Sequence, residues 1–377
     1  MKHIRHHVLI ALTAVALSGI LIGCAGTGAG LSKYEMDKKA TLDTVKAGRF
    51  DGGKMWTFDD PPVEYFQQAY GFRPDKKWLD DVRMAALRYS GCSASFVSAD
   101  GLVMTNHHCV RGNLPAVQKD GEKLLENGFY AATLELERKI PNASLDQLVE
   151  IRDVTKDVLA AMDAAATDKD KVDARQKKIA DIEKTIGDQT KLRAQVVTLY
   201  NGGKFALYLY KRYNDVRLVF APELQAAHFG GEYDNFTYPR YAFDCAFLRI
   251  YGEDGKPLKT EHFYQWSTNG AEENELVFVI GNPGRTSRLS TTEQLEYNRD
   301  IAYPFTYKML RERVDLLTEY MNRNPQKKEI LYPQILGVAN GMKSYQGRLS
   351  GLRDDLLVQR RRAFDRSFRA EVEKRAD

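Results

Sequence analysis

The sequence predicts a mixed β and α fold, in which a β-rich domain carries a helical insertion and is followed by a helical stretch. Short runs of β-branched and aromatic residues, bounded by turn residues, recur from about residue 90 to 283. Between about 144 and 195, apolar residues instead recur at helical spacing among many charges. After Ser290 the pattern is helical to the end of the chain. With 43% hydrophobic residues among 377, a core can be buried.

The N-terminal residues predict an export signal rather than part of the fold. A basic start is followed by an apolar stretch, residues 8–22, that is too short for a membrane span. It ends in Leu-Ile-Gly-Cys, which resembles a bacterial lipobox. The resemblance implies that residues 1–23 are removed and that Cys24 carries lipid, which anchors the chain to a membrane. The alternative is an ordinary secretory signal with an incidental cysteine. Residues 24–50 then form a tether.

The remaining elements follow from local patterns. Residues 51–90 mix aromatics, prolines and short helical patterns. The run ASFVS, the turn signal Asp-Gly and the run LVMTN predict a β-hairpin. The stretch 144–195 predicts a helical hairpin broken near Thr167–Lys169. Strand patterns return from Val196, in FALYLYKRYNDVRLVFAP and AFDCAFLRIYG, and ELVFVIGNPG predicts a buried strand that ends at a Gly-Pro turn.

Charge and cysteine content narrow the class of protein. The 55 basic and 51 acidic residues nearly balance, and no long run of one sign occurs, so nothing indicates nucleic-acid binding. An exported chain can form disulfides. Cys92 and Cys109 flank the predicted hairpin and are the expected pair. Cys245 lies in an apolar run and is expected to be a small buried side chain.

The sequence His107-His108-Cys109 is the strongest chemical signal. Adjacent strand residues point to opposite faces, and no second pair at zinc spacing occurs, so a metal site is disfavoured. Both histidines could be structural, packed beside a disulfide. Alternatively, a histidine held rigidly before a disulfide-bonded cysteine can act as a general base. The motif resembles the His-Cys corner of chymotrypsin-like serine proteases, an analogy that makes His108 the base and points His107 into structure.

A general base needs a carboxylate to orient it. Asp244 stands in the apolar run FDCAFLRIY, where an unpaired carboxylate is costly to bury. Pairing with His108 accounts for it, and the alternative is an aspartate at a strand edge facing solvent.

Four segments together resemble the S46 family of bacterial dipeptidyl peptidases: GCSASFVSADGLVMTNHHC, NGFYA, NDVRLVFAPELQAAHFGGEYDNFTYPRYAFDCAFLRIY and VIGNPGRTSR. The resemblance implies a chymotrypsin-like double β-barrel with an inserted α-helical domain. It also implies removal of dipeptides from free N-termini by a Ser-His-Asp triad, with His108 as base and Asp244 as its partner. Residues 51–289 then form the first barrel lobe and 290–377 an incomplete helical domain. The family resemblance suggests homodimers and no cofactor.

The same resemblance implies a pocket for the substrate's amino group. Asn235 matches the amine-binding asparagine, Phe236 stands where the family usually has tryptophan, and Arg240 matches a supporting arginine. Asn340, from the helical domain, is a further expected member. Glu232 and Tyr241 replace a usual aspartate and histidine, so the affinity and substrate range of this pocket are open to change.

The nucleophile is not found in the sequence. The family's serine lies in a Gly-Asn-Ser-Gly turn of the second lobe, and this motif does not occur in the 377 residues. We therefore expect the second lobe to be missing and the chain by itself to be inactive. Two alternatives are a lipid-anchored protein that binds peptide N-termini without cleaving them, and a structural envelope lipoprotein. The expected location is the periplasm or outer membrane of a Gram-negative bacterium.

Overall fold

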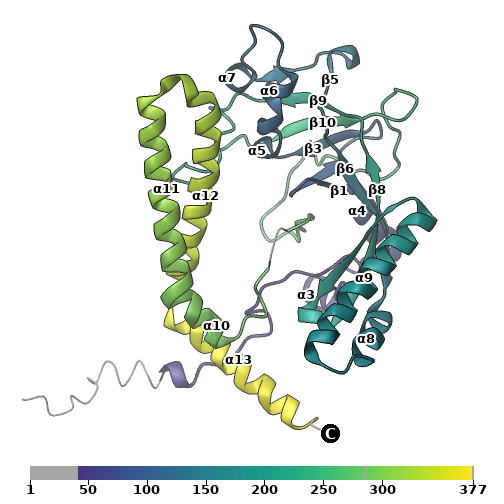
Figure 1. The fold of residues 1–377 in the computed structure, drawn as a ribbon, viewed down its shortest axis with the longest axis vertical. Coiled ribbons are helices and arrows are strands. Elements are labelled where there is room, and N and C mark those ends of the chain that lie inside the picture. Colours follow the sequence, from purple (N-terminus) through teal and green to yellow (C-terminus); the bar gives the residue numbers. More distant parts are fainter. Residues whose placement is uncertain (1–40, 284–285, 376–377) are drawn as a thin grey trace, which may run out of the picture. The chain divides into compact units, whose positions relative to one another are not determined.

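The computed structural model describes residues 41–283 and 286–375, shown as a ribbon in Figure 1. The described residues divide into two compact units, 41–51 with 354–375, and 52–353. The larger unit contains every expected active-site residue. Cys24, the signal and most of the tether lie outside the described residues, so lipidation stays a prediction. Among the described helices, none is long and apolar enough to cross a membrane.

A single antiparallel sheet organises the larger unit. Its strands run in the order β4-β9-β10-β3-β2-β1-β6-β8-β7, and β5 pairs with β9. The strands are β1 (Ala86–Tyr89), β2 (Cys92–Phe96), β3 (Leu102–Thr105), β4 (Phe129–Tyr130), β5 (Arg138–Lys139), β6 (Leu145–Asp153), β7 (Arg193–Leu199), β8 (Lys204–Tyr213), β9 (Val216–Ala221) and β10 (Ala246–Ile250). The mixed fold with a large sheet is as expected, and closure into a barrel stays a prediction.

The helices complete the fold. They are α3 (Val63–Tyr70), α4 (Lys76–Ala85), α5 (His107–Val110), α6 (Leu114–Val117), α7 (Leu124–Asn127), α8 (Thr155–Asp163), α9 (Asp168–Thr190), α10 (Thr292–Tyr297), α11 (Tyr303–Arg323), α12 (Lys328–Leu352) and α13 (Asp355–Glu373). A π-helical turn, Asn298–Ala302, joins α10 to α11. The chain after Ser290 is helical, as predicted, and Figure 1 shows α11 and α12 side by side as an antiparallel pair.

The predicted hairpin is formed by β2 and β3, which pair with Phe96 opposite Val103. Both of these side chains are fully buried in the main core, together with Leu218 and Leu248 from neighbouring strands. Gly101, in the turn, has φ +67°, and a Cβ there would stand 2.9 Å from the Ile250 carbonyl oxygen. Only glycine combines that conformation with so close an approach of β10.

The helical insertion starts later than predicted. Residues 145–153 form β6, which pairs with β1 on one side and β8 on the other. The sequence of β6 fits a helix by its apolar spacing, but hydrogen bonding to two neighbouring strands decides its conformation. The predicted break is present: Thr167 caps α9, accepting a hydrogen bond from the Asp170 amide.

The predicted strand ELVFVIGNPG is not a strand. Residues 276–283 form no helix or strand and have no strand partner among the described residues. Their side chains alternate, with Val277 63% and Val279 100% exposed. The segment is tied to the hairpin at its end, where the Asn282 amide donates to Ser93 Oγ over 2.7 Å. The prediction of a buried strand was wrong, because no neighbouring strand among the described residues pairs with this segment or covers its exposed side chains.

Candidate active site

A disulfide closes the hairpin that carries the two histidines. Cys92 begins β2, Cys109 lies in α5, and the two are joined, as predicted, with Cα atoms 6.4 Å apart. His107 and His108 lie in the single turn of α5 rather than at the end of a strand, which corrects the strand assumption. Successive residues of a helix still point in different directions, so the two imidazoles diverge.

His108 and Asp244 are in direct contact. Nδ1 of His108 lies 2.7 Å from Oδ2 of Asp244, and the His108 amide donates to Oδ1 over 2.9 Å. Asn106 Nδ2 also donates to Oδ2, over 3.3 Å. Asp244 precedes β10 rather than lying within it, and its side chain is only 6% exposed. With the carboxylate ionised, Nδ1 carries the proton and Nε2 is left as a basic lone pair.

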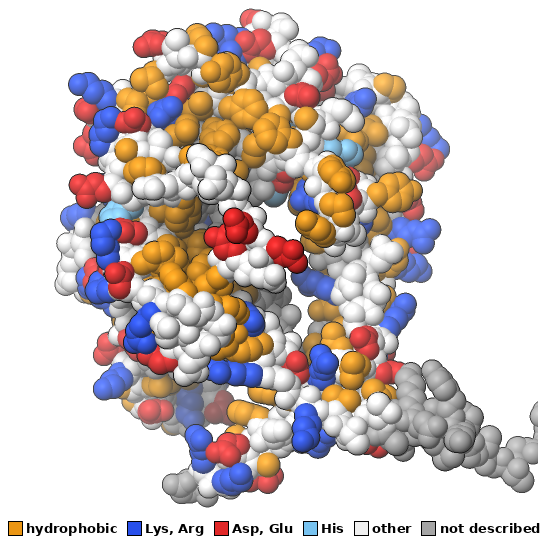
Figure 2. Space-filling model, turned by 180° about the vertical axis from the view of Figure 1, so that it is seen from behind, with side chains coloured by type: hydrophobic (Ala, Val, Ile, Leu, Met, Phe, Trp, Pro, Cys, Tyr) orange, Lys and Arg blue, Asp and Glu red, His pale blue; other side chains and the backbone are white. Residues whose placement is uncertain are grey.

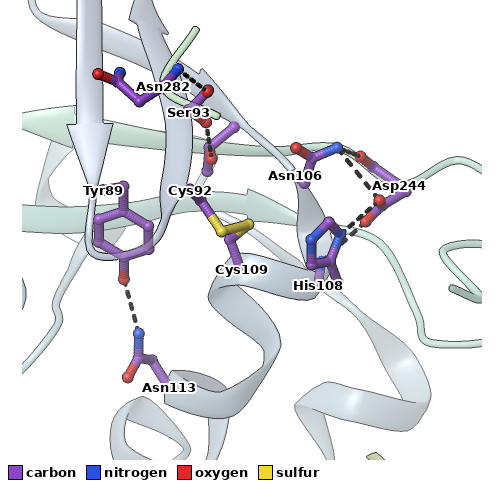
Figure 3. The surroundings of a disulfide bond; sticks show 10 residues. Tyr89, Cys92, Ser93, Asn106, His108, Cys109, Asn113, Asp244 and Asn282 are labelled. Atoms are coloured by element: carbon purple, nitrogen blue, oxygen red, sulfur yellow. Dashed lines mark hydrogen bonds and ion pairs between the residues drawn. A yellow bond between two sulfur atoms is a disulfide. The ribbon is translucent and has the colours of Figure 1, made fainter. Parts of the chain in front are cut away.

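The disulfide lies near the same ring. Figure 3 shows the His108 imidazole between Asp244 and the sulfur atoms of Cys92 and Cys109. One ring nitrogen of His108 lies within 4.8 Å of the sulfur atoms of Cys92 and Cys109. Among the described residues, these three side chains are the ones placed closely enough to be considered as metal ligands. The disulfide uses both thiolates, and Asp244 occupies Nδ1, so the oxidised site does not fit a zinc ion.

His107 occupies the opposite environment. It is completely buried, as expected, and its ring nitrogens have no well-formed hydrogen bond among the described residues. Burial lowers the pKa of His107 from 6.5 to about 4, since the nearby carboxylate of Asp244 and the carbonyl of Pro222 compensate for only part of the lost hydration. His107 is therefore a neutral core residue at physiological pH.

Two residues that the sequence analysis missed support His108. Phe229 stacks on the His108 ring, with centroids 4.1 Å apart and planes 13° from parallel. Arg111 is buried and donates to the Phe229 carbonyl oxygen over 3.2 Å. The sequence held one signal for Phe229: it precedes Gly230-Gly231, and paired glycines often mark a close approach of two backbones.

The expected amine-pocket residues are joined by contacts of two kinds. Arg240 lies over the Phe229 ring at 4.9 Å and pairs with Glu232 at 3.0 Å. Asn235 is buried, and its Nδ2 donates to Asn340 Oδ1 of α12 over 2.9 Å. Phe229 therefore contacts both His108 and Arg240, and Asn235 and Asn340 form a separate pair.

Phe236 differs from its neighbours in this loop. Its side chain is largely exposed and its φ is +61°, a conformation that few residues other than glycine adopt. The backbone thus directs an aromatic ring outward beside buried Asn235. An exposed aromatic ring in this position is available to line a ligand site.

Helix α12 is fixed against the same loop. Lys343 donates to the carbonyl oxygens of Glu232 and Tyr233, over 2.6 and 2.8 Å. Gly230 has φ +123°, and a Cβ there would lie 2.1 Å from the Leu336 carbonyl oxygen. The close approach explains how Asn340, more than a hundred residues away in sequence, reaches Asn235.

Cys245 is a free, half-buried thiol next to Asp244. Burial, together with the Asp244 carboxylate, raises the pKa of Cys245. The thiol is therefore protonated and unreactive at neutral pH, which fits the expected role as a small apolar side chain.

Comparison with known proteins identifies the family. The family model described as peptidase S46 matches residues 50–377. The chain belongs to the S46 peptidase family. Its curated relatives include an Asp/Glu-specific dipeptidyl-peptidase of Shewanella putrefaciens, 32% identical over 292 residues that cover 74% of this chain and 39% of that protein. The dipeptidyl-peptidase 7 of Capnocytophaga gingivalis is 25% identical, covering 74% of this chain and 40% of that protein.

Solved S46 structures share the fold. The crystal structure of Porphyromonas endodontalis DPP11 in complex with the dipeptide Arg-Glu matches with a TM-score of 0.73 and 20% identity, covering 88% of this chain and 50% of that chain. Both of the curated relatives above are named as dipeptidyl-peptidases. The chain spans about 40% of the length of the curated relatives it matches.

Proposed function

We propose that this chain carries the general base and the orienting carboxylate of a serine-type dipeptidyl aminopeptidase, whose nucleophile lies in a second lobe. The contact between His108 Nδ1 and Asp244 Oδ2, at 2.7 Å, carries the proposal. It is the base–orienter pair that acyl-transfer chemistry requires, and it occurs in a chain of the S46 family.

His108 would act through Nε2. In the attack step, Nε2 accepts the proton of a serine hydroxyl while the serine oxygen bonds the scissile carbonyl carbon, and the same proton then passes to the leaving amine. Asp244 stabilises the imidazolium that forms in between. The disulfide beside the ring and the Phe229 stack hold the imidazole in one orientation, which such a transfer needs.

The loop at 229–240 would bind the free amino group of the peptide. Because Asn235 Nδ2 donates to Asn340, the carbonyl oxygen of the Asn235 side chain is left to accept a hydrogen bond from an ammonium group. Exposed Phe236 supplies an aromatic wall for that cation. Arg240 holds Glu232 and so shapes the loop. Anchoring the amine at a fixed distance from His108 would select cleavage after the second residue.

A second lobe would cover surface that this chain leaves open. Figure 2 shows apolar side chains gathered in patches on one face of the structure. Trp266, Val277 and Val279 are among the exposed apolar residues, and the two valines belong to a segment that pairs with no strand in residues 41–283 and 286–375. Exposed apolar patches of this kind are uncommon on isolated domains and are typical of surfaces that bind another domain. We propose that a second lobe covers them and also supplies the serine and the oxyanion hole.

Activity assays on matched chains test this proposal. Residues 24–377 alone should release no chromophore from a dipeptidyl substrate, and a chain continuing into a second lobe should release it.

In that longer chain, Asp244→Asn should lower kcat/KM about ten-thousandfold, because the amide stabilises the wrong imidazole tautomer. Asp215→Asn, which removes a carboxylate paired with Arg217, is the matched control and should keep activity. Clear turnover by 24–377 that His108→Ala abolishes would contradict the two-lobe arrangement.

Peptide binding separates catalysis from simple capture. Calorimetry on residues 24–377 should show weaker binding of an N-acetylated peptide than of the same peptide with a free amine, and Asn235→Ala should remove that difference. Equal affinities would count against an amine pocket. Binding that stays selective in a longer chain without turnover would favour the alternative, a lipid-anchored peptide-binding protein.

Export, lipid attachment at Cys24 and homodimer formation belong to the same proposal. Labelled fatty acid should be incorporated into the wild-type chain in a Gram-negative host and not into Cys24→Ser. Incorporation into Cys24→Ser would show that another residue is modified.

A further inference from the structure

A pocket lined by three arginines opens on strands other than those adjoining His108 and Asp244. It encloses about 350 Å³, and Arg88, Arg193 and Arg212 line it together with a single carboxylate, Asp146. These side chains come from β1, β6, β7 and β8. Gln195 and Ser90 add neutral polar groups to its wall. Nothing in the proposed peptidase chemistry uses this pocket.

The sheet register builds the cluster. Asp146 on β6 stands directly opposite Arg88 on β1 and directly opposite Arg212 on β8. Side chains in register on adjacent strands share a face and lie close together. Arg193, on β7 next to β8, completes the row from one strand further out. Because paired strands fix all four backbones, the arginines are held near one another before any ligand arrives.

Every arginine of the cluster contacts the same carboxylate. Arg193 Nη1 lies 2.6 Å from Asp146 Oδ2, and Arg212 bonds both oxygens, through Nε at 2.7 Å and Nη2 at 3.0 Å. Arg88 Nη2 lies 3.3 Å from Oδ2, and its guanidinium is stacked 4.4 Å from the Tyr210 ring. The Asp146 side chain is 5% exposed, whereas those of Arg193 and Arg212 are 44% and 41% exposed.

The charges of this cluster do not balance. One carboxylate neutralises one of three guanidinium groups, and the remaining positive charges repel each other within a small volume. Donor capacity is also left over. Among the described residues, Nε and Nη2 of Arg193 and Nη1 of Arg212 have no hydrogen-bond partner. A second anion in the pocket would relieve the repulsion and use these donors.

We propose that this pocket is a binding site for a small dianionic oxyanion, of the phosphate or dicarboxylate type. Guanidinium groups bind phosphate and carboxylate oxygens through paired N–H donors, and Arg193 and Arg212 present such donors from fixed strands. The volume of about 350 Å³ is at the small end of ligand pockets, which favours a small anion over a large cofactor.

Calorimetric titration of residues 24–377 with inorganic phosphate and, separately, with succinate tests the site, with chloride adjusted to constant ionic strength. At least one of the two anions should bind with a defined stoichiometry of one, and the one that binds identifies the ligand type. Arg193→Gln should weaken that binding at least tenfold. Arg152→Gln is the matched control: Arg152 also lies on a strand, is 40% exposed and pairs with one carboxylate, Glu150, outside the pocket. It should bind as the wild type does.

A second variant keeps the test decisive if Arg193→Gln folds poorly. Asp146→Asn removes the carboxylate that lines the pocket, so anion affinity should rise several-fold. The substitution should also lower the melting temperature, and added anion should restore most of that decrease. An ordinary structural ion-pair network would lose stability without such rescue. Failure of both anions to bind above chloride, or equal binding by the wild type and Arg193→Gln, would overturn the proposal.

Discussion

At the scale of residues, two adjacent histidines have opposite chemistry because their surroundings differ. His108 is partly exposed and bonded to Asp244, whereas His107 is fully buried. The imidazole ring is the same in both cases. Hydration and hydrogen bonding therefore differ between two neighbouring copies of the same side chain.

His107 predicts a dependence of stability on pH. Its pKa is about 4 in the folded protein and 6.5 as a free side chain, so between these values the unfolded chain binds a proton that the folded chain does not. The free energy of unfolding should therefore be highest above pH 6.5 and should decrease as the pH is lowered toward 4. Protonation of His107 accounts for at most about 3 kcal/mol of this decrease. Urea unfolding should show that the free energy of unfolding of His107→Gln changes less with pH across this range than that of the wild type.

Half-exposed His262, whose Nδ1 lies 2.9 Å from Asp81, supplies the control for that measurement. His262→Gln tests whether removal of any histidine alters this pH dependence in the same way. If the free energy of unfolding of His107→Gln depends on pH as that of the wild type does, the pKa of His107 is not lowered in the folded state.

At the scale of elements, the β2–β3 hairpin and α5 form one covalently closed unit. The disulfide joins residues 17 apart in sequence, so it restricts the unfolded chain as well as holding α5. Replacing both Cys92 and Cys109 by alanine should lower the free energy of unfolding by about 3 kcal/mol. Denaturant unfolding measures this, with Cys245→Ala as the control that removes a thiol without opening a loop. If the double substitution lowers the free energy of unfolding no more than Cys245→Ala does, packing alone holds α5 against the hairpin.

The contact between α12 and the amine-pocket loop depends on one glycine. Gly230→Ala places a Cβ 2.1 Å from the Leu336 carbonyl oxygen at φ +123°, so backbone must move. Gly231→Ala is its neighbour and control, since the nearest atom there, Leu336 Cδ2, is 3.4 Å away. Gly230→Ala should cost roughly 2 kcal/mol or more and speed hydrogen exchange in α12, and Gly231→Ala should cost less. Equal effects of the two changes would mean that the loop and helix are not tightly fixed.

At the scale of the whole molecule, the chain buries two hydrophobic clusters yet leaves an apolar segment uncovered. Seventeen core residues, including Phe96, Leu218 and Leu248, form the main cluster. By contrast, Val277 and Val279 are mostly or fully exposed, and their segment has no strand partner within the described part of the chain. Under the proposed function, this uncovered segment is part of the surface that a second lobe would cover.

These exposed valines predict how the isolated chain behaves in solution. Replacing Val277 and Val279 together by threonine should leave the free energy of unfolding within about 0.5 kcal/mol of the wild type, because neither side chain is buried. The same change should reduce self-association, measured by light scattering over a concentration series. Replacing fully buried Val103 by threonine is the contrasting control and should be clearly destabilising. A large loss of stability in the double variant would show that the segment is packed.

The sequence by itself determined the local features of this protein. Asp-Gly between two apolar runs determined the hairpin, the spacing of Cys92 and Cys109 predicted their pairing, and helical spacing predicted the chain after Ser290. Each depends on residues near one another along the chain, where backbone geometry and turn chemistry act directly.

Only the tertiary structure decided features that depend on distant partners. Residues 145–153 became a strand because β1 and β8 lie on either side, and residues 276–283 did not, because no partner is present among the described residues. Phe229 and Arg111 gained their places beside His108 through contacts across the fold. The row of Arg88, Asp146 and Arg212 exists only in the register of three strands. Pairing across long sequence separations is set by the whole core and leaves little trace in local patterns.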